Sequence, residues 1–167
     1  MKKIICALFL CLLLISCNRN DDILSYQNGD ISARCIINGE YEVDISKKGD
    51  VRELKIVSPS SLDNISFVYD SGSWSAICDD IKIPLNADEL DGICALASIF
   101  DLDKSAISTA YDTDGVGIVS FDMNEICYTV TYNGLSLPER IKITSDTLDF
   151  DVEIASISIA DKNDYRQ

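Results

Sequence analysis

The stretch SARCIINGEYEVDIS, residues Ser32–Ser46, carries the pattern that decides the fold of this 167-residue chain. Asn38-Gly39 is a dipeptide that readily takes the positive φ angles of a two-residue turn between antiparallel strands. After it, Tyr41, Val43 and Ile45 alternate with acidic residues. That alternation is typical of a strand with one buried and one solvated face, so the stretch predicts a β-hairpin.

Glycine turns continue to separate strand-like runs along most of the chain. The further turn signals are Lys48-Gly49, Ser71-Gly72, Asp114-Gly115 and Asn133-Gly134. The runs between them are Val51–Val57, Ile65–Tyr69, Trp74–Cys78, Ile81–Leu85, Ala106–Tyr111, Val116–Met123, Cys127–Tyr132 and Arg140–Thr144. Connections this short favour antiparallel neighbours, so the chain is predicted to be mainly β.

The last predicted strand changes phase in its middle. Apolar residues occupy the even positions from Phe150 to Ile154 and the odd positions from Ala155 to Ile159. Because side chains alternate between the two faces of a strand, one extra residue must be absorbed. We therefore expect a bulge or a sharp bend near Ile154-Ala155.

One segment departs from the two-residue rhythm. Asn86 stands three positions before Glu89, as in a capping box. Apolar residues then recur at helical spacing at Leu90, Ile93, Ala97 and Phe100. The pattern predicts an amphipathic helix over Ala87–Leu102, in which Gly92 costs about 1 kcal/mol. Such a helix buries its apolar side across the sheet, and Cys94 is expected to face the sheet.

The N-terminus reads as an export signal. A positive start is followed by the apolar run Ile4–Ile15, which is shorter than the ~20 residues needed to span a bilayer. Leu14-Ile15-Ser16-Cys17 resembles the bacterial lipobox, and the resemblance implies that Cys17 receives a diacylglyceryl group before residues 1–16 are removed. The alternatives are an ordinary cleavable signal, or a short anchor helix with an incidental cysteine.

Lipidation would set both the domain organisation and the location. Residues 17–28 are polar and would form a tether, and residues 29–167 are expected to form a single β-rich domain. The protein would be lipid-anchored on the extracytoplasmic face of a bacterial cell membrane. Two or three acyl chains hold a protein stably where one does not.

The charge balance limits the class of partner. The chain has 28 acidic and 14 basic residues, and the loss of Lys2 and Lys3 would move its net charge from −14 to −16. An acidic surface repels nucleic acid, so no nucleic-acid partner is expected. The carboxylates are scattered along the chain, which is typical of a solvated surface.

Cysteine spacing and the absence of histidine argue against a metal site. Cys35, Cys78, Cys94 and Cys127 are far apart in sequence, with no C-x-x-C pair. We expect no cofactor and no metal. Disulfides among these four remain possible outside the cytoplasm, and the other possibility is that each is a small buried hydrophobic residue.

No catalytic constellation stands out. A histidine-dependent triad is impossible, and the carboxylate pairs Asp79-Asp80 and Asp101-x-Asp103 fit an extended segment and a solvated helix end. The stretch from Asp112 to Gly117 matches a calcium loop at three positions but has Val116 and Met123 where oxygen ligands belong. A hairpin turn is the better interpretation, and the chain is expected not to be an enzyme.

The order of these signals resembles the LolA/LolB-like lipoprotein-carrier fold, in the form of short lipoproteins of Gram-positive bacteria. The resemblance spans roughly Ser25 to Ile159 and rests on SYQNGDISARC (25–35), KIVSPSSLDNISFVYDSGSW (55–74) and YTVTYNGLSLPERIKI (128–143). It implies a strongly curved antiparallel sheet, a half-barrel, with the helix across its concave face. Members of this family carry or receive lipidated proteins, or bind lipoglycans, in an apolar cavity.

This chain also departs from the enteric carriers. Those begin with a long helix and have further helices in the cavity, whereas residues 21–27 here allow only a turn or two. No residue that the carriers use in cargo transfer can be matched, so no functional site is transferred from them.

Two hypotheses about function follow. The first is a membrane-anchored, non-catalytic binding module whose partner is an apolar ligand, such as a lipid or acyl chain, or a lipidated protein. The second is a surface adaptor that contacts protein or cell-wall partners and has no ligand cavity. For the first, strand parity and helix spacing select the candidate lining residues Leu54, Phe67, Trp74, Leu96 and Phe100.

Overall fold

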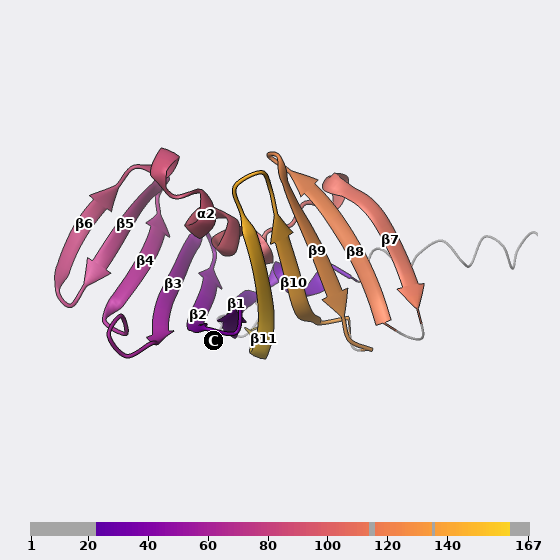
Figure 1. Cartoon of the computed structure of the whole chain (residues 1–167), viewed down its shortest axis with the longest axis horizontal. Helices are drawn as coiled ribbons and strands as arrows, with labels where there is room; N and C mark the ends of the chain where they lie inside the picture. Colours follow the sequence, from indigo (N-terminus) through magenta and orange to yellow (C-terminus); the bar gives the residue numbers. More distant parts are fainter. Residues whose placement is uncertain (1–22, 114–115, 135, 161–167) are drawn as a thin grey trace, which may run out of the picture.

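One curved antiparallel sheet organises the part of the chain that the structure describes. The structure is a computed structural model that describes residues 23–113, 116–134 and 136–160. Eleven strands in these residues follow the order β6-β5-β4-β3-β2-β1-β11-β10-β9-β8-β7. Figure 1 shows the sheet as an unclosed arch with β1 and β11 at its middle and β6 and β7 at its ends. The predicted fold class is therefore confirmed.

The strand boundaries follow the predicted runs closely. The strands are β1 (Asp30–Ile37), β2 (Tyr41–Lys48), β3 (Val51–Ser58), β4 (Ile65–Asp70), β5 (Ser73–Cys78), β6 (Ile81–Leu85), β7 (Ile107–Thr113), β8 (Val116–Met123), β9 (Ile126–Tyr132), β10 (Pro138–Thr144) and β11 (Asp149–Ala160). Strands β7 and β8 pair across the stretch considered above as a calcium loop, as the hairpin interpretation predicts. Residues 114 and 115 of that stretch lie outside the described residues.

The predicted Asn-Gly hairpin holds the middle of the sheet together. Asn38 and Gly39 have φ angles of 53° and 70°, both in the left-handed region. Pairing between β1 and β2 begins at Ile37 and Tyr41, so the loop has one residue more than the two predicted. Asn38 also extends the contact with β11, because its N–H donates to the Asp151 carbonyl at 2.8 Å and its side-chain oxygen accepts from the Asp151 N–H at 2.8 Å.

The predicted bulge in the last strand is present. Arg34 pairs with Ser156 and the next residue, Cys35, pairs with Ile154, so Ala155 has no partner in β1. Skipping one residue returns the apolar side chains of β11 to the same face of the sheet on both sides of the bulge.

The helical segment is shorter than predicted. Residues 87–102 were expected to form one helix, but the α-helix α2 covers only Asp91–Ala97. It lies between the 3-10 turns η4 (Ala87–Glu89) and η5 (Ser98–Phe100). Leu90, with φ −121° and ψ 25°, interrupts the helix at its start. At its end the Ser98 hydroxyl donates to the Cys94 carbonyl at 2.8 Å.

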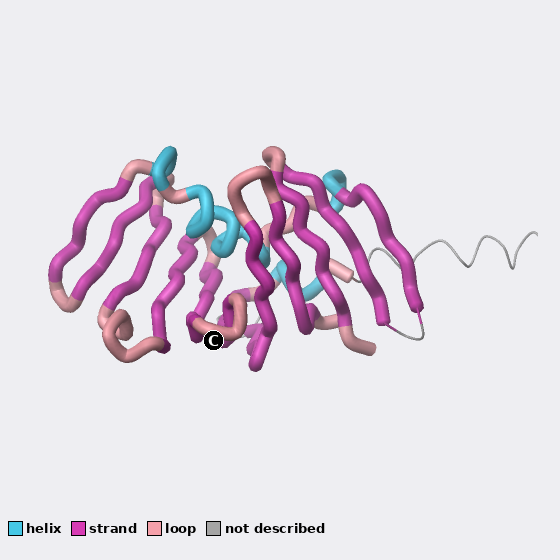
Figure 2. The backbone as a smooth tube through the Cα atoms, in the orientation of Figure 1, coloured by secondary structure: helices cyan, strands magenta, loops and turns pink. Residues whose placement is uncertain are grey.

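Helical segments pack against one face of the sheet, which we call the inner face (Figure 2). On the β8–β10 side this face is filled by side chains. Tyr26, from the 3-10 turn η3 (Ser25–Asn28), packs edge-on against Phe100 with ring centroids 6.4 Å apart and against Tyr132 of β9 at the same distance. The end of the segment expected to form a polar tether thus contributes a buried aromatic residue to the core.

Parts of the N-terminal prediction fall outside the structure. Residues 1–22, with the expected signal peptide and Cys17, are outside the described residues. In the described ranges, no helix combines the length and the hydropathy needed to cross a membrane. Cys35, Cys78, Cys94 and Cys127 are free thiols rather than disulfide-bonded, and Cys35 is fully buried.

Candidate ligand-binding trough

The inner face remains apolar across β3 to β6, where little covers it. Strand register places Leu54 opposite Phe67, Phe67 opposite Ala76, and Ala76 opposite Ile83, in one row across four strands. Exposure rises along this row from 3% at Leu54 to 48% at Ile83. Ile81, one step further along β6 on the same face, is 65% exposed. We call this uncovered apolar surface the trough.

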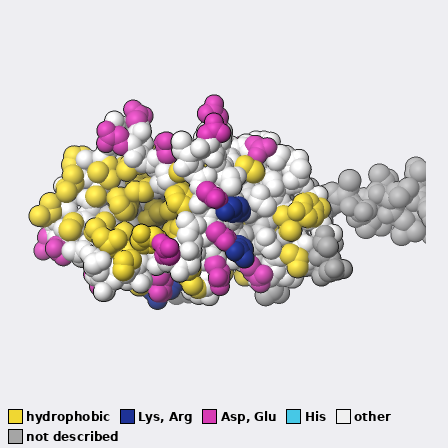
Figure 3. Space-filling view, viewed as in Figure 1, with side chains coloured by type: hydrophobic (Ala, Val, Ile, Leu, Met, Phe, Trp, Pro, Cys, Tyr) yellow, Lys and Arg dark blue, Asp and Glu magenta, His cyan; other side chains and the backbone are white. Residues whose placement is uncertain are grey.

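A cavity of about 200 Å³ opens into the trough beside α2. All nine of its lining residues are apolar or aromatic, and they come from β1 to β4, α2 and β11. They are Ile37, Tyr41, Val43, Leu54, Ile56, Phe67, Ile93, Leu96 and Phe150. Figure 3 shows hydrophobic side chains gathered around a hollow over the β3–β6 part of the molecule.

Three of the five predicted lining residues meet at this cavity, namely Leu54, Phe67 and Leu96. Trp74 and Phe100 lie elsewhere in the core. Trp74 packs against Tyr69 with ring centroids 5.3 Å apart. Phe100 is fully buried against Tyr26, in the filled part of the inner face. Whether any of these side chains contacts a ligand remains a prediction.

Sequence reasoning missed the wall formed by β11. Phe150 belongs to a strand far along the chain, and only the closing of β11 onto β1 and β10 brings it near α2. A Cβ atom added at Gly92 would lie 3.2 Å from the Phe150 ring and 3.7 Å from Leu148. The glycine that lowered the helix propensity is therefore the residue that lets α2 approach β11 closely.

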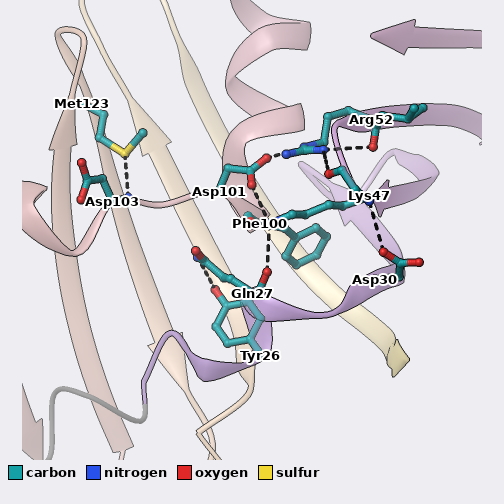
Figure 4. Close-up of polar contacts among 11 residues, drawn as sticks. Tyr26, Gln27, Asp30, Lys47, Arg52, Phe100, Asp101, Asp103 and Met123 are labelled. Carbon is teal, nitrogen blue, oxygen red and sulfur yellow. Dashed lines mark hydrogen bonds and ion pairs between the residues drawn. The ribbon is translucent and has the colours of Figure 1, made fainter. Parts of the chain in front are cut away.

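An ion-pair cluster fixes the chain where it leaves the helical segment (Figure 4). The Lys47 ammonium lies 2.6 Å from one carboxylate oxygen of Asp101, and the Arg52 guanidinium pairs with the other. Lys47 also donates to the carbonyls of Gln27 at 3.0 Å and Phe100 at 3.1 Å. Asp101 was expected to be solvated, but it neutralises two largely buried cations and joins η3 and η5 to strands β2 and β3.

Cys94 is placed on α2 as a half-buried thiol that packs against the core. Burial raises the pKa of this thiol, and the nearby Asp91 carboxylate raises it further. The thiol is therefore protonated near neutral pH, the form that reacts slowly with alkylating reagents. This placement agrees with the expectation that Cys94 faces the sheet.

A second hollow, of about 360 Å³, lies beside the β8–β9 and β10–β11 turns. Its lining is mixed: three acidic residues, two hydroxyl residues, Ile126 and Cys127. Among the described residues, no group of three or more acidic, cysteine or histidine side chains is placed to hold a metal ion. The trough is thus the better candidate for a binding site.

Comparisons with known proteins find distant similarities to two solved structures. No protein-family model matches the chain, and no curated protein does. An uncharacterized conserved protein from Thermus thermophilus is similar over 87% of this chain and 88% of its own, with TM-score 0.48 and 9% identity. A LolA superfamily protein from Nitrosomonas europaea is similar over 85% and 94%, with TM-score 0.44 and 10% identity. Both TM-scores are below 0.5, and neither likeness bears on what this chain binds.

Proposed function

We propose that this chain is a lipid-anchored protein of the extracytoplasmic face of a bacterial cell membrane, and that its trough binds the apolar part of a lipid or of a lipidated protein without catalysis. One observation carries the proposal. The inner face is apolar as far as the edge strand β6, yet Ile81 and Ile83 there are 65% and 48% exposed. Contiguous exposed apolar surface is characteristic of binding sites.

The size of the cavity defines the mode of binding. At about 200 Å³ it is smaller than the roughly 300–1,000 Å³ of sites that enclose a drug-sized ligand. It accommodates a segment of an acyl chain between α2 and β11. The remainder of the chain would lie along the open row formed by Phe67, Ala76 and Ile83. The proposed complex therefore leaves one side of the ligand exposed.

A pair of variants in β6 tests the proposal. Ile83→Asp puts a charge on the trough at a side chain that is already half exposed, so the fold should be retained. Lys82→Gln changes the net charge by the same amount at the neighbouring residue, whose pairing with Ile77 places it on the other face. Binding of a twelve-carbon amphiphile, measured by calorimetry, should weaken at least fivefold in Ile83→Asp and remain unchanged in Lys82→Gln. Equal affinity in the two variants would contradict the proposal.

The small volume favours a second candidate, the surface adaptor. In that case the exposed apolar row of β6 contacts another protein and the cavity stays empty. Native mass spectrometry of the protein purified from its own host distinguishes the two. A lipid mass retained on the wild type and lost from Ile83→Asp supports ligand binding. Absence of any bound lipid, with no rise in Tm on adding fatty acid or lipopeptide, supports the adaptor.

A further inference from the structure

The trough has an acidic margin, and this bears on the polar part of the ligand. Two lining residues have acidic neighbours in sequence: Glu40 precedes Tyr41, and Asp91 lies two positions before Ile93. Asp149, which precedes the lining residue Phe150, pairs instead with Lys142 on the outer face. The Glu40 and Asp91 carboxylates are both exposed. Figure 3 shows acidic side chains at the margins of the hydrophobic area.

The connecting segments around the trough contain no basic residue. In the β1–β6 half, the connections at the end of the sheet where the cavity lies are residues 38–40, 59–64 and 79–80. Residues 145–148 lead into β11, and residues 86–91 lead into α2. Each of these five segments contains an acidic residue, and none contains lysine or arginine. Among the described strand residues, register places only two cations on the inner face of the β1–β6 half, Lys47 and Arg52, and Asp101 already pairs with both.

From this charge distribution, and on the basis of the proposed function, we infer that the trough selects an acyl chain carried on a cationic head group and discriminates against an anionic one. An anionic head at the trough meets like charge and finds no free cation among the described residues of the inner face. A cationic head is attracted by the exposed carboxylates of Glu40 and Asp91, and salt screens this attraction over a Debye length of roughly 10 Å at 0.1 M.

Probes with the same tail and different heads test this inference. The chain from residue 18 to 167 contains every described strand and the whole described core, and a cooperative thermal transition would establish that it is folded. Dodecylamine, dodecyl maltoside and laurate supply cationic, neutral and anionic heads at pH 7, and butylamine supplies a cationic head on a short tail. Calorimetry below the micelle concentration of each probe gives the affinities.

We expect dodecylamine to bind about tenfold more tightly than laurate at 20 mM salt, with the ratio shrinking at 0.5 M salt because the charges are screened. The double variant Glu40→Gln/Asp91→Asn should lower the ratio to about threefold. The matched variant Asp122→Asn/Glu125→Gln removes two carboxylates beside the other hollow and should leave the ratio unchanged.

The possible failures are distinguishable. If laurate binds as tightly as dodecylamine, head-group selection is wrong and the proposed apolar binding stands. An equal loss of preference in both double variants would mean that net charge, not the trough margin, causes it, which also overturns the inference. If no twelve-carbon probe binds more tightly than butylamine, the proposed function and this inference both fail.

Discussion

Asp101→Asn should destabilise the protein strongly, because this carboxylate neutralises two cations that the fold has largely buried. The side chains of Lys47 and Arg52 are only 13% and 16% exposed. Asparagine keeps one oxygen acceptor but removes the charge, so both cations lose their counter-ion. Breaking a buried ion pair costs roughly 3–5 kcal/mol. Because Asp101 itself is 32% exposed and water can approach it, we expect a smaller loss of about 2–3 kcal/mol.

Urea unfolding followed by tryptophan fluorescence measures this loss, since Trp74 is the chain's only tryptophan and is buried. For a chain of this size, a loss of about 2–3 kcal/mol corresponds to a fall in Tm of roughly 5–10 °C. Asp122→Asn, which removes an exposed carboxylate on β8, is the control and should change the free energy of unfolding by less than about 0.5 kcal/mol.

If Asp101→Asn lowers the free energy of unfolding by less than about 0.5 kcal/mol, the reasoning is refuted. That result would mean that the two cations reach water on their own and that the ion-pair cluster does not hold the helical segment on the sheet. A double variant in which Lys47→Met accompanies Asp101→Asn should recover part of the loss, because one unpaired buried cation is removed.

Four further predictions concern single residues. Gly92→Ala should gain about 1 kcal/mol from helix propensity and lose about 2 kcal/mol because Phe150 is forced to shift. Urea unfolding should therefore show a net loss of about 1 kcal/mol in the free energy of unfolding. A stabilised variant would contradict the close contact between Gly92 and Phe150. In native protein, a thiol reagent should label Cys94 slowly and the fully buried Cys35 more slowly still, and rapid labelling of Cys94 would mean that α2 is rotated. Cys17→Ala should leave an unprocessed precursor without acyl label in cells fed labelled fatty acid, and continued acylation would disprove lipidation at that position. Burial raises the pKa of the Cys35 thiol to about 12. The stability that this protonated thiol contributes is therefore complete below the unfolded pKa of about 8.5 and declines as pH rises toward 12. The free energy of unfolding measured in urea should be lower at pH 10.5 than at pH 8, and Cys35→Ala should reduce this difference.

Features that depend on neighbouring residues were predictable from sequence. The turn at Asn38-Gly39 depends on two backbone conformations, and the bulge at Ala155 depends on the parity of a single strand. Both were predicted in the right place. Asn86 was also identified correctly as a capping residue, since its side chain accepts from the Asp88 N–H at 3.4 Å, although the turn it caps is 3-10.

Features that depend on contacts across the sheet were not predictable. Helical spacing from Leu90 to Phe100 looks the same whether the segment is one helix or three short turns, because both place apolar residues on one side. From sequence, Gly92 was expected only to lower helix propensity. In the structure, its lack of a side chain allows a close contact with Phe150, far along the chain. Register places Trp74 and Phe67 on the same face, and only the packing shows that Phe67 lines the cavity while Trp74 packs against Tyr69. The same limit explains why Asp101 was expected in water: Lys47 and Arg52 reach it from strands at least 49 residues away.

The edge strand β6 explains how so much apolar surface can stay uncovered. An exposed edge with apolar side chains tends to pair with the edge of another molecule and to aggregate. Strand β6 has three features that oppose such pairing: it is only five residues long, Lys82 carries a charge near its centre, and Pro84 has no N–H to donate to a further strand. None of these features reduces the apolar character of the inner face, because Lys82 and Pro84 alternate with Ile81, Ile83 and Leu85. The strand thus blocks association through its backbone while keeping its apolar side chains accessible. This combination is compatible with the proposed binding of an apolar ligand at the trough, because the ligand needs the side chains of β6 and not its backbone.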